Sequence, residues 1–524
     1  MINYLEEYLT KRNPLLVAIF LFILAFILRL YMVFVNEVIV HDGILYINMA
    51  RIIDSGNLGK ISEISFFNLY PFLIVLSQKI FQDWELAGRM VSAILGSITI
   101  ISLFFLIRKM INVKVAIIAS LFYMIGPRFV EYSSDVLRES TFWFFSITAL
   151  WLAWEGISGK RWFLLVLSSI FTGLSIFTRI EGISIFIIIA IWIFWHFRET
   201  GDSLKRTFLF LLILIISLPV MISSSLFVLK NRLDNWEFGQ VGMYLEDKNL
   251  LIYGTGRLLE VKPDILNKTS TQFQTFLDIA KRHKYTIYFS EMVYKILKSF
   301  HIVLFIFFLF GIFRRRVIPY SRNEIPALIW FMVFFLTSFF YMTKKYYFGT
   351  RHGLLMGFPM LIWSGIGFYE LKERIEKWTS KTKLFSGVSK FSAILLIFII
   401  LILILPQALS SNRDDKIELK KAGIYLKDMG YSKVRFVGEP ILHRVLFYAD
   451  SEFIPLPSGL TFDEVVKFLR ENQTRFLIID KRTVDAFLHN FNKNVDPLIL
   501  EKVQLPKLDQ FKEYSIVVYR LKKE

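Results

Sequence analysis

Asp42 is a carboxylate placed just beyond a long apolar run. It lies in the string His41-Asp42-Gly43-Ile44-Leu45-Tyr46, which follows the apolar residues 14–35. A charged side chain at the edge of a membrane span is costly, and such residues commonly mark functional sites. A carboxylate here could act as a general base. The alternative is an ordinary solvated Asp that stabilises the first turn of a helix.

Two further acids, Asp135 and Glu139, precede the apolar run 141–154. Their spacing of four places both on one helix face, if the helix extends that far. With Asp42 they would put two or three carboxylates on one side of the membrane. Such a group can supply a base or hold a divalent cation through oxygen ligands. The sequence therefore leaves open a Mg²⁺ or Mn²⁺ ion at Asp42 and Glu139, without requiring one.

Basic side chains recur at the helix ends expected to face outward, where the positive-inside bias disfavours them. An anionic ligand at the outer surface is the simplest explanation, because Arg binds phosphate bidentately and stays charged. The alternative is local pairing, Arg138 with Asp135 and Arg179 with Glu181. The candidate phosphate ligands are Arg89, Arg138, Arg179, Lys344, Arg351 and His352, and the candidate pocket residues on the same side are His41, Tyr46, Tyr70, Tyr132 and Glu181.

The composition is that of a polytopic membrane protein with soluble parts. The 524 residues are 55% hydrophobic and 17% aromatic, with 20% charged residues. The chain has no Cys, which excludes disulfides and thiolate chemistry. The formal charge of +18 is typical of basic loops beside anionic membrane lipids. No motif for binding nucleic acid is present.

The apolar runs predict about eleven transmembrane helices, each near the length of ~20 residues that a span needs. Residues 66–81 are apolar but carry Pro71, Gln78 and Lys79, and we expect an amphipathic helix lying at the interface. With the N-terminus inside, every predicted cytoplasmic loop is basic. The predicted spans are 14–36, 88–107, 113–128, 137–155, 162–178, 180–197, 206–228, 299–313, 325–342, 352–369 and 390–409.

Three longer regions are then expected outside the membrane, at 37–87, 229–298 and 412–524. The first two would belong to a transmembrane domain, 1–411, and the second would contain helices near 271–283 and 286–300. In the tail, 434–437, 476–479 and 516–519 have the composition of strands, and 416–429 and 462–471 that of helices. The sequence therefore predicts a polytopic α-helical membrane protein with a small α/β domain, 412–524, on the non-cytoplasmic face.

The order of these features resembles a known family, the GT-C membrane glycosyltransferases. The most similar group comprises the dolichyl-phosphate-mannose protein mannosyltransferases and the aminoarabinose transferases. The likeness extends over roughly residues 14–370, and its specificity lies in the order of the motifs. The residues that carry it are 41–50, Leu69-Tyr70-Pro71-Phe72-Leu73, 85–96, Ser133-Ser134-Asp135-Val136-Leu137-Arg138-Glu139, 173–182 with Arg179-Ile180-Glu181-Gly182, Arg351-His352-Gly353 and Pro359.

This resemblance implies transfer of a sugar from a polyprenyl-phosphate donor to a lipid, glycan or protein acceptor on the outer face of the membrane. The membrane would be the cell membrane, that is, the inner or plasma membrane. Asp42 matches the family's catalytic Asp, while Gly43 stands where the family usually has Glu. Asp135 or Glu139 would therefore have to supply any second carboxylate. Two other classes stay open from the sequence, namely a transporter or flippase of lipid-linked sugars and a non-catalytic envelope assembly protein.

Overall fold

The chain folds into two compact units. A computed structural model describes residues 13–58, 68–230, 270–345, 348–381, 392–488, 491, 495–505, 508 and 514–522. The first unit, here called the membrane unit, comprises Met1–Val33 and Tyr46–Ser410. The second, here called the C-terminal unit, comprises Phe34–Leu45 and Ser411–Glu524. The division into domains at residue 411 stays a prediction, and each unit is described by itself below.

The membrane unit is built from helices. Each of the predicted apolar spans coincides with one of them, and the two helices expected near 271–283 and 286–300 are also present. In chain order the helices are α2 (Pro14–Val35), α3 (His41–Asp54, whose first turn belongs to the C-terminal unit), α5 (Tyr70–Phe81), α6 (Trp84–Met110), α7 (Val113–Ile125), α8 (Pro127–Tyr132), α9 (Glu139–Ser158), α10 (Trp162–Thr178), η2 (Ile180–Gly182), α11 (Ile183–Glu199), α12 (Leu204–Lys230), α16 (Thr271–Arg282), α17 (Lys284–Phe300), α18 (Ile302–Phe313), η3 (Arg322–Glu324), α19 (Ile325–Lys345), α20 (Thr350–Lys381) and α21 (Ser392–Ala408).

The protein is a multi-pass membrane protein. Among the described residues, five helices are long and apolar enough to cross a membrane, or six if the bent pair α17 and α18 counts as one span. Several others, including α7 and α10, are apolar but shorter. The number of about eleven crossings therefore stays a prediction.

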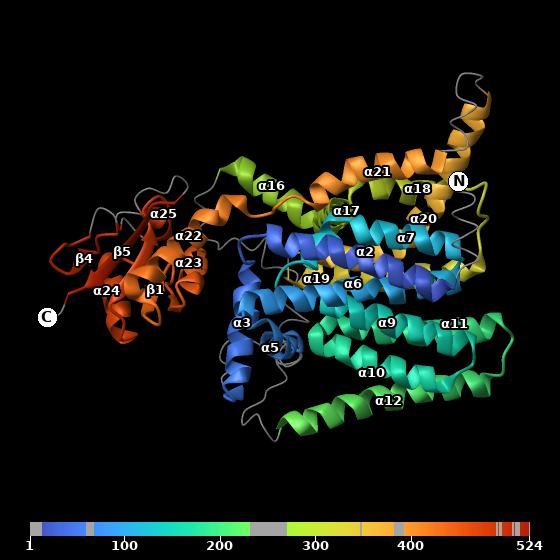
Figure 1. Cartoon of the computed structure of the whole chain (residues 1–524), viewed down its shortest axis with the longest axis horizontal. Coiled ribbons are helices and arrows are strands. Elements are labelled where there is room, and N and C mark those ends of the chain that lie inside the picture. Colours follow the sequence, from blue (N-terminus) through green and yellow to red (C-terminus); the bar gives the residue numbers. More distant parts are fainter. Residues whose placement is uncertain are drawn as a thin grey trace. The chain divides into compact units, whose positions relative to one another are not determined.

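Two helices organise the packing of the bundle. α9 packs against α6, α10 and α11, and α20 packs against α7, α17, α18 and α19. Figure 1 shows α2, α6, α9, α10 and α12 running side by side. Large aromatic side chains fill the spaces between these helices, among them Trp143, Trp192, Trp330, Phe122 and Phe129. Because α9 and α20 are central, residues at their first turns are held by neighbours on several sides.

Short segments and tight caps join the helices at their ends. The Asp83 side chain accepts a hydrogen bond from the Leu86 amide at the start of α6, and Asn112 does the same for Val115 at the start of α7. Pro71 is the second residue of α5, and its fixed φ suits a first helical turn. The Tyr70 and Ser77 side chains both bond to α6 carbonyls, those of Gly88 and Ala87. Residues seven apart on α5 thus reach neighbouring residues of α6, so α5 crosses α6 rather than running alongside it. Its predicted place at the membrane interface is not tested.

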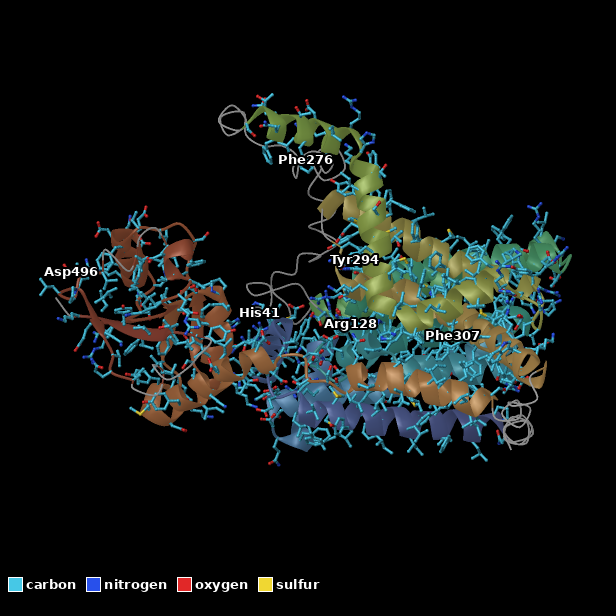
Figure 2. The ribbon with its side chains drawn as sticks, turned by 90° about the horizontal axis from the view of Figure 1, so that it is seen from above. His41, Arg128, Phe276, Tyr294, Phe307 and Asp496 are labelled. Atoms are coloured by element: carbon cyan, nitrogen blue, oxygen red, sulfur yellow. The ribbon has the colours of Figure 1, made fainter. Side chains whose placement is uncertain are left out.

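The helix pair α17 and α18 is sharply bent. The angle between them is 108°, at a break around His301. His301 has a positive φ of 66°, and its ring accepts a hydrogen bond from the Val303 amide that starts α18. Figure 2 shows the bend between α17, which carries Tyr294, and α18, which carries Phe307.

The C-terminal unit contains a five-stranded mixed sheet in the order β2-β1-β3-β5-β4. β1, β2 and β3 are parallel, and β5 is antiparallel to both β3 and β4. The strands expected near 434–437, 476–479 and 516–519 coincide with β1, β3 and β5, while β2 and β4 were not predicted. Its elements are η6 (Asp414–Lys416), α22 (Ile417–Leu426), η7 (Lys427–Tyr431), β1 (Arg435–Gly438), η8 (Pro440–Leu442), α23 (His443–Tyr448), β2 (Glu452–Pro455), α24 (Phe462–Glu471), β3 (Phe476–Asp480), α25 (Val484–Phe487), β4 (Leu500–Lys502) and β5 (Ile516–Leu521).

Candidate active site

A buried ion network connects three helix ends of the membrane unit. Arg179 follows the last residue of α10, and its Nη1 donates to Glu139 Oε1 at the start of α9, at 2.6 Å. Its Nη2 and Nε donate to the two oxygens of Glu181 in η2, at 2.6 Å and 3.3 Å. The side chains of Glu139 and Arg179 are 1% and 5% exposed. Burial by itself lowers the pKa of Arg179, but the carboxylates of Glu181 and Glu139 outweigh it, and that pKa lies above its usual value.

The first turn of α20 brings a second guanidinium to the same carboxylate. Arg351 Nη1 donates to Glu139 Oε1 at 3.3 Å, and its side chain is 32% exposed. Next to it, His352 Nε2 lies 3.7 Å from Glu181 Oε1, while its Nδ1 accepts from the Gly349 amide. Five of the predicted site residues therefore meet in one place: Glu139, Arg179, Glu181, Arg351 and His352.

Tyr132 forms a hydrogen bond with the first residue of α20. Its hydroxyl shares a hydrogen bond of 2.7 Å with Thr350 Oγ1. Burial, and next the charge of Glu131, raise the pKa of Tyr132 to about 12, so the phenol keeps its proton at neutral pH. Thr350 carried no chemical signal of its own in the sequence and was not predicted.

Arg138, Tyr46 and Tyr70 form an adjoining group. The Arg138 Nη1 donates to the carbonyl of Thr178, the residue before Arg179, at 3.4 Å. Its guanidinium carbon lies 5.9 Å from the centre of the Tyr46 ring, and that ring meets Tyr70 edge-on at 5.4 Å. The Tyr70 hydroxyl in turn contacts Ser92, whose hydroxyl donates to the Leu137 carbonyl. The predicted pocket residues of the membrane unit thus lie on four elements: Tyr46 on α3, Tyr70 on α5, Tyr132 on α8 and Glu181 on η2.

The turn that precedes α9 is held by a charge buried inside α2. Arg29 is fully buried, and its Nε donates to Ser133 Oγ at 2.7 Å. Gly96 of α6 allows the approach, because a Cβ there would lie 2.4 Å from the Ser133 Cβ. Sequence reasoning missed Arg29 because it considered charges at helix ends. An Arg within an apolar run was the available signal.

Asp135 lies in this turn and not on α9. The helix begins at Glu139, so the spacing of four does not place Asp135 and Glu139 on one helix face, contrary to the conditional expectation. Asp135 is nevertheless buried, at 1% exposure. It remains a candidate because it lies beside the same helix start.

The remaining basic side chains make contacts elsewhere in the membrane unit. Arg89 pairs with Glu85 one turn earlier on α6 and donates to the Val33 carbonyl at 2.8 Å. Arg128 likewise pairs with Glu131 within α8. The local pairing considered for Arg179 and Glu181 is present as well. Lys344 lies at the end of α19, and its side chain is outside the described residues.

Asp42 and His41 lie in the C-terminal unit. Asp42 occupies the first turn of α3 and is half-buried, and Tyr46 follows one turn later on the same helix. An acid in a first helical turn also interacts favourably with the helix dipole. The His41 ring lies 5.5 Å from the ring of His443.

A metal centre was left open by the sequence. No cluster of three or more His, Asp or Glu that could hold an ion occurs in the described part of the chain. At Glu139 the Oε1 atom already accepts from two guanidinium groups, which is a poor arrangement for a cation ligand. We therefore derive no step through a metal, and dependence on Mg²⁺ or Mn²⁺ stays a prediction.

Comparisons with known proteins identify the fold. Residues 68–225 match the family model of the dolichyl-phosphate-mannose-protein mannosyltransferases. ArnT from Cupriavidus metallidurans, solved with bound undecaprenyl phosphate, superposes with a TM-score of 0.57 at 12% identity, over 97% of this chain and 97% of that one. The oligosaccharyltransferase of Archaeoglobus fulgidus, solved with zinc and sulfate, gives a TM-score of 0.52 at 13% identity, over 91% of this chain and 71% of that one. No curated protein matches the sequence.

The chain therefore has the GT-C membrane glycosyltransferase fold. It is similar to the dolichyl-phosphate-mannose protein mannosyltransferase and aminoarabinose transferase group, and the resemblance noted from the sequence is confirmed.

Removal of the Arg179 charge should destabilise the membrane unit. In Arg179→Gln, two buried or half-buried carboxylates, Glu139 and Glu181, lose their main counter-charge, and breaking such a pair typically costs about 3–5 kcal/mol. The matched control is Arg206→Gln, which removes one of two pairs of Asp202 at the protein surface, leaves Lys160 beside that carboxylate, and should cost at most about 1 kcal/mol. Thermal unfolding of the purified protein measures both, and equal melting temperatures for the two variants would contradict the structural role of Arg179.

Proposed function

We propose that the protein is an inverting glycosyltransferase that moves a sugar from a polyprenyl-phosphate donor to an acceptor outside the membrane. The observation that carries the proposal is the network of Glu139, Arg179, Glu181 and Arg351 in a chain with the GT-C fold. The acceptor is a lipid, a glycan or a protein. Binding of undecaprenyl phosphate by the ArnT of C. metallidurans supports the class of donor.

The site gathers several guanidinium groups, which are suited to binding an anion. Arg138 lies within electrostatic range of Glu181 and bonds to the carbonyl just before Arg179. The guanidinium groups of Arg138, Arg179 and Arg351 thus all lie close to the carboxylates of Glu139 and Glu181. A phosphate that enters this site would gain charge-assisted hydrogen bonds from planar, permanently charged donors.

The basic residues divide into two roles under this proposal. Arg179 is buried between two carboxylates and holds the site together. Arg351 is one third exposed, and Arg138 is half-buried, so these two bind the donor phosphate and stabilise the negative charge of the leaving group. Arg89, His352 and Lys344 remain further candidates for the same phosphate.

Asp42 acts as the general base. It takes the proton of the acceptor nucleophile as that atom bonds to the anomeric carbon, the bond between this carbon and the phosphate oxygen breaks, and polyprenyl phosphate leaves. Asp42 has the place of the family's catalytic Asp in sequence.

The base assignment predicts the behaviour of Asp42→Asn. The change keeps the size of the side chain but removes its basicity, so the variant should fold and bind donor yet turn over at least ~100-fold more slowly. Release of polyprenyl phosphate, measured with a panel of polyprenyl-phosphate sugars and membrane extract as the acceptor source, reports turnover. Asp54→Asn, at the exposed far end of the same helix, is the control. Near-normal turnover of Asp42→Asn would transfer the role to Asp135 or Glu139.

The donor assignment predicts the behaviour of Arg351→Gln. A hydrogen bond to a charged group contributes about 1.5–3 kcal/mol, so the donor concentration for half-maximal rate should rise roughly tenfold or more. Stability should change little, because Arg351 is partly exposed and Arg179 still neutralises Glu139. Arg322→Gln, which removes a solvent-exposed pair with Glu199, is the matched control. Unchanged donor dependence in Arg351→Gln would make Arg351 a structural partner of Glu139.

The orientation is part of the proposal. The N-terminus is cytoplasmic, about eleven spans follow, and the C-terminal unit lies outside, because the loops then expected inside are all basic. Since the chain has no Cys, single Cys residues can be introduced at the exposed positions Asn412 and Thr200. A membrane-impermeant thiol reagent should label only Asn412→Cys in intact cells. Labelling of Thr200→Cys to the same extent would refute this orientation.

A further inference from the structure

Four side chains of the C-terminal unit bind the backbone of residues 37–39. The Lys420 ammonium donates to the Glu37 carbonyl at 2.9 Å, and Arg413 Nε donates to the Val38 carbonyl at 2.8 Å. Arg444 Nε donates to the Ile39 carbonyl at 3.1 Å. The Tyr448 hydroxyl accepts from the Ile39 amide at 2.7 Å. Three consecutive peptide units are thus held from one side.

These side chains come from two adjoining helices and the turn before them. Lys420 lies on α22, Arg444 and Tyr448 lie on α23, and Arg413 precedes η6. α22 and α23 pack against each other through Leu419, Ala422, Val445 and Leu446 in one buried cluster. The four side chains are therefore carried by one packed helix pair and the turn before it. We call Arg413, Lys420, Arg444 and Tyr448 together the backbone clamp.

The clamped segment is also buried through its side chains. Val38 is 1% exposed and Ile39 is 0% exposed. At the next residues the Val40 carbonyl accepts from the Gly43 amide at 3.0 Å, which begins α3. The His41 ring meets the His443 ring edge-on, and His443 stacks on Phe453 at 4.5 Å. The segment is thus fixed up to the residue that precedes Asp42.

Three of the four side chains of the clamp carry a positive charge. Two Arg and one Lys donate to peptide carbonyls, and charge-assisted bonds of this kind are stronger than neutral ones. Burial, and next the charges of His41 and Arg444, lower the pKa of His443 to about 4, so its ring is neutral at pH 7. The permanent charges of the clamp are therefore those of Arg413, Lys420 and Arg444. Bonds to the backbone fix the path of the chain whatever side chains the segment carries.

We propose that the backbone clamp of the C-terminal unit positions Asp42 for catalysis. Lys420, Arg413, Arg444 and Tyr448 are positioning residues, which act through the first turn of α3 and do not touch the substrate. The proposal rests on the function proposed for Asp42. It gives the C-terminal unit a role in the reaction, because a general base must lie within hydrogen-bond reach of the proton it removes. A displacement of about 1 Å can cost on the order of 100-fold in rate.

A double-mutant cycle tests this inference. The clamp variants are Tyr448→Phe, which removes one hydroxyl and keeps the ring, and Arg444→Gln, with Arg444→Lys as the conservative change. Each is made in the full-length chain with Asp42 intact and with Asp42→Asn. Arg520→Gln, which removes an exposed ion pair with Glu501 on β5, is the control within the same unit.

We expect the clamp variants to lower kcat about tenfold while KM for the polyprenyl-phosphate sugar stays within about twofold, since the base is displaced but the donor site is intact. In the Asp42→Asn background the same variants should cause no further loss, because they act through a base that is already absent. Arg444→Lys should recover part of the rate. Hydrogen exchange of peptides that cover residues 37–45 should be faster in Tyr448→Phe and unchanged in Arg520→Gln.

The outcomes distinguish failure of the positioning role of the clamp from failure of Asp42 as the general base. If Asp42→Asn is slow and the clamp variants keep the wild-type rate, the clamp inference is overturned and the proposed function stands. Equal losses in both backgrounds also overturn it, because the four residues would then serve stability alone. If Asp42→Asn itself turns over normally, the assignment of the base fails, and the positioning role fails with it.

Discussion

The ion network around Arg179 is the interaction on which the site depends. Arg179 follows α10, Glu139 begins α9, Glu181 lies in η2 before α11, and Arg351 lies in the first turn of α20. Apolar side chains hold these helices along their lengths, but such contacts are non-directional and leave the ends free to shift. Directed bonds between buried charges fix the ends in one arrangement. Apolar packing therefore brings the helices together, and the ion pairs of Arg179 fix the positions of their ends relative to one another.

A second buried cation acts on the same region from inside the bundle. Arg29 reaches from α2 to Ser133, and Ser133 begins the turn that leads through Asp135 to Glu139. Its guanidinium carbon also lies 5.0 Å from the centre of the Tyr123 ring, and Tyr123 bonds to the Gly96 carbonyl of α6. A cation in this apolar environment is costly unless its hydrogen bonds are satisfied. The turn before α9 is thus held by a side chain of α2, which itself packs against α6.

The sequence predicts the helices well and the contacts between them only in part. Apolar runs gave α2, α10 and α20 to within a few residues at their starts, because a membrane span has a required length and composition. The pair of Arg179 with Glu181 was accessible from their proximity in sequence. The pairs of Glu139 with Arg179 and Arg351, 40 and 212 residues away, depend on how helices pack, which no local pattern encodes. The backbone clamp had no signal at all, because its acceptors are peptide carbonyls of residues of any type.

The presence of these buried charges itself argues for function. Replacing a buried ion pair by well-packed apolar side chains is often neutral or stabilising, because desolvation of two charges offsets their attraction. Stability alone would therefore not favour Glu139 and Arg179 over apolar residues in a bundle already rich in Phe and Trp. The guanidinium of Arg351 beside them is one third exposed, so part of it is open to solvent. Under the proposed function this is the group that a lipid-linked phosphate approaches, since the charge of such a lipid is carried at the membrane surface while its chain stays in the bilayer.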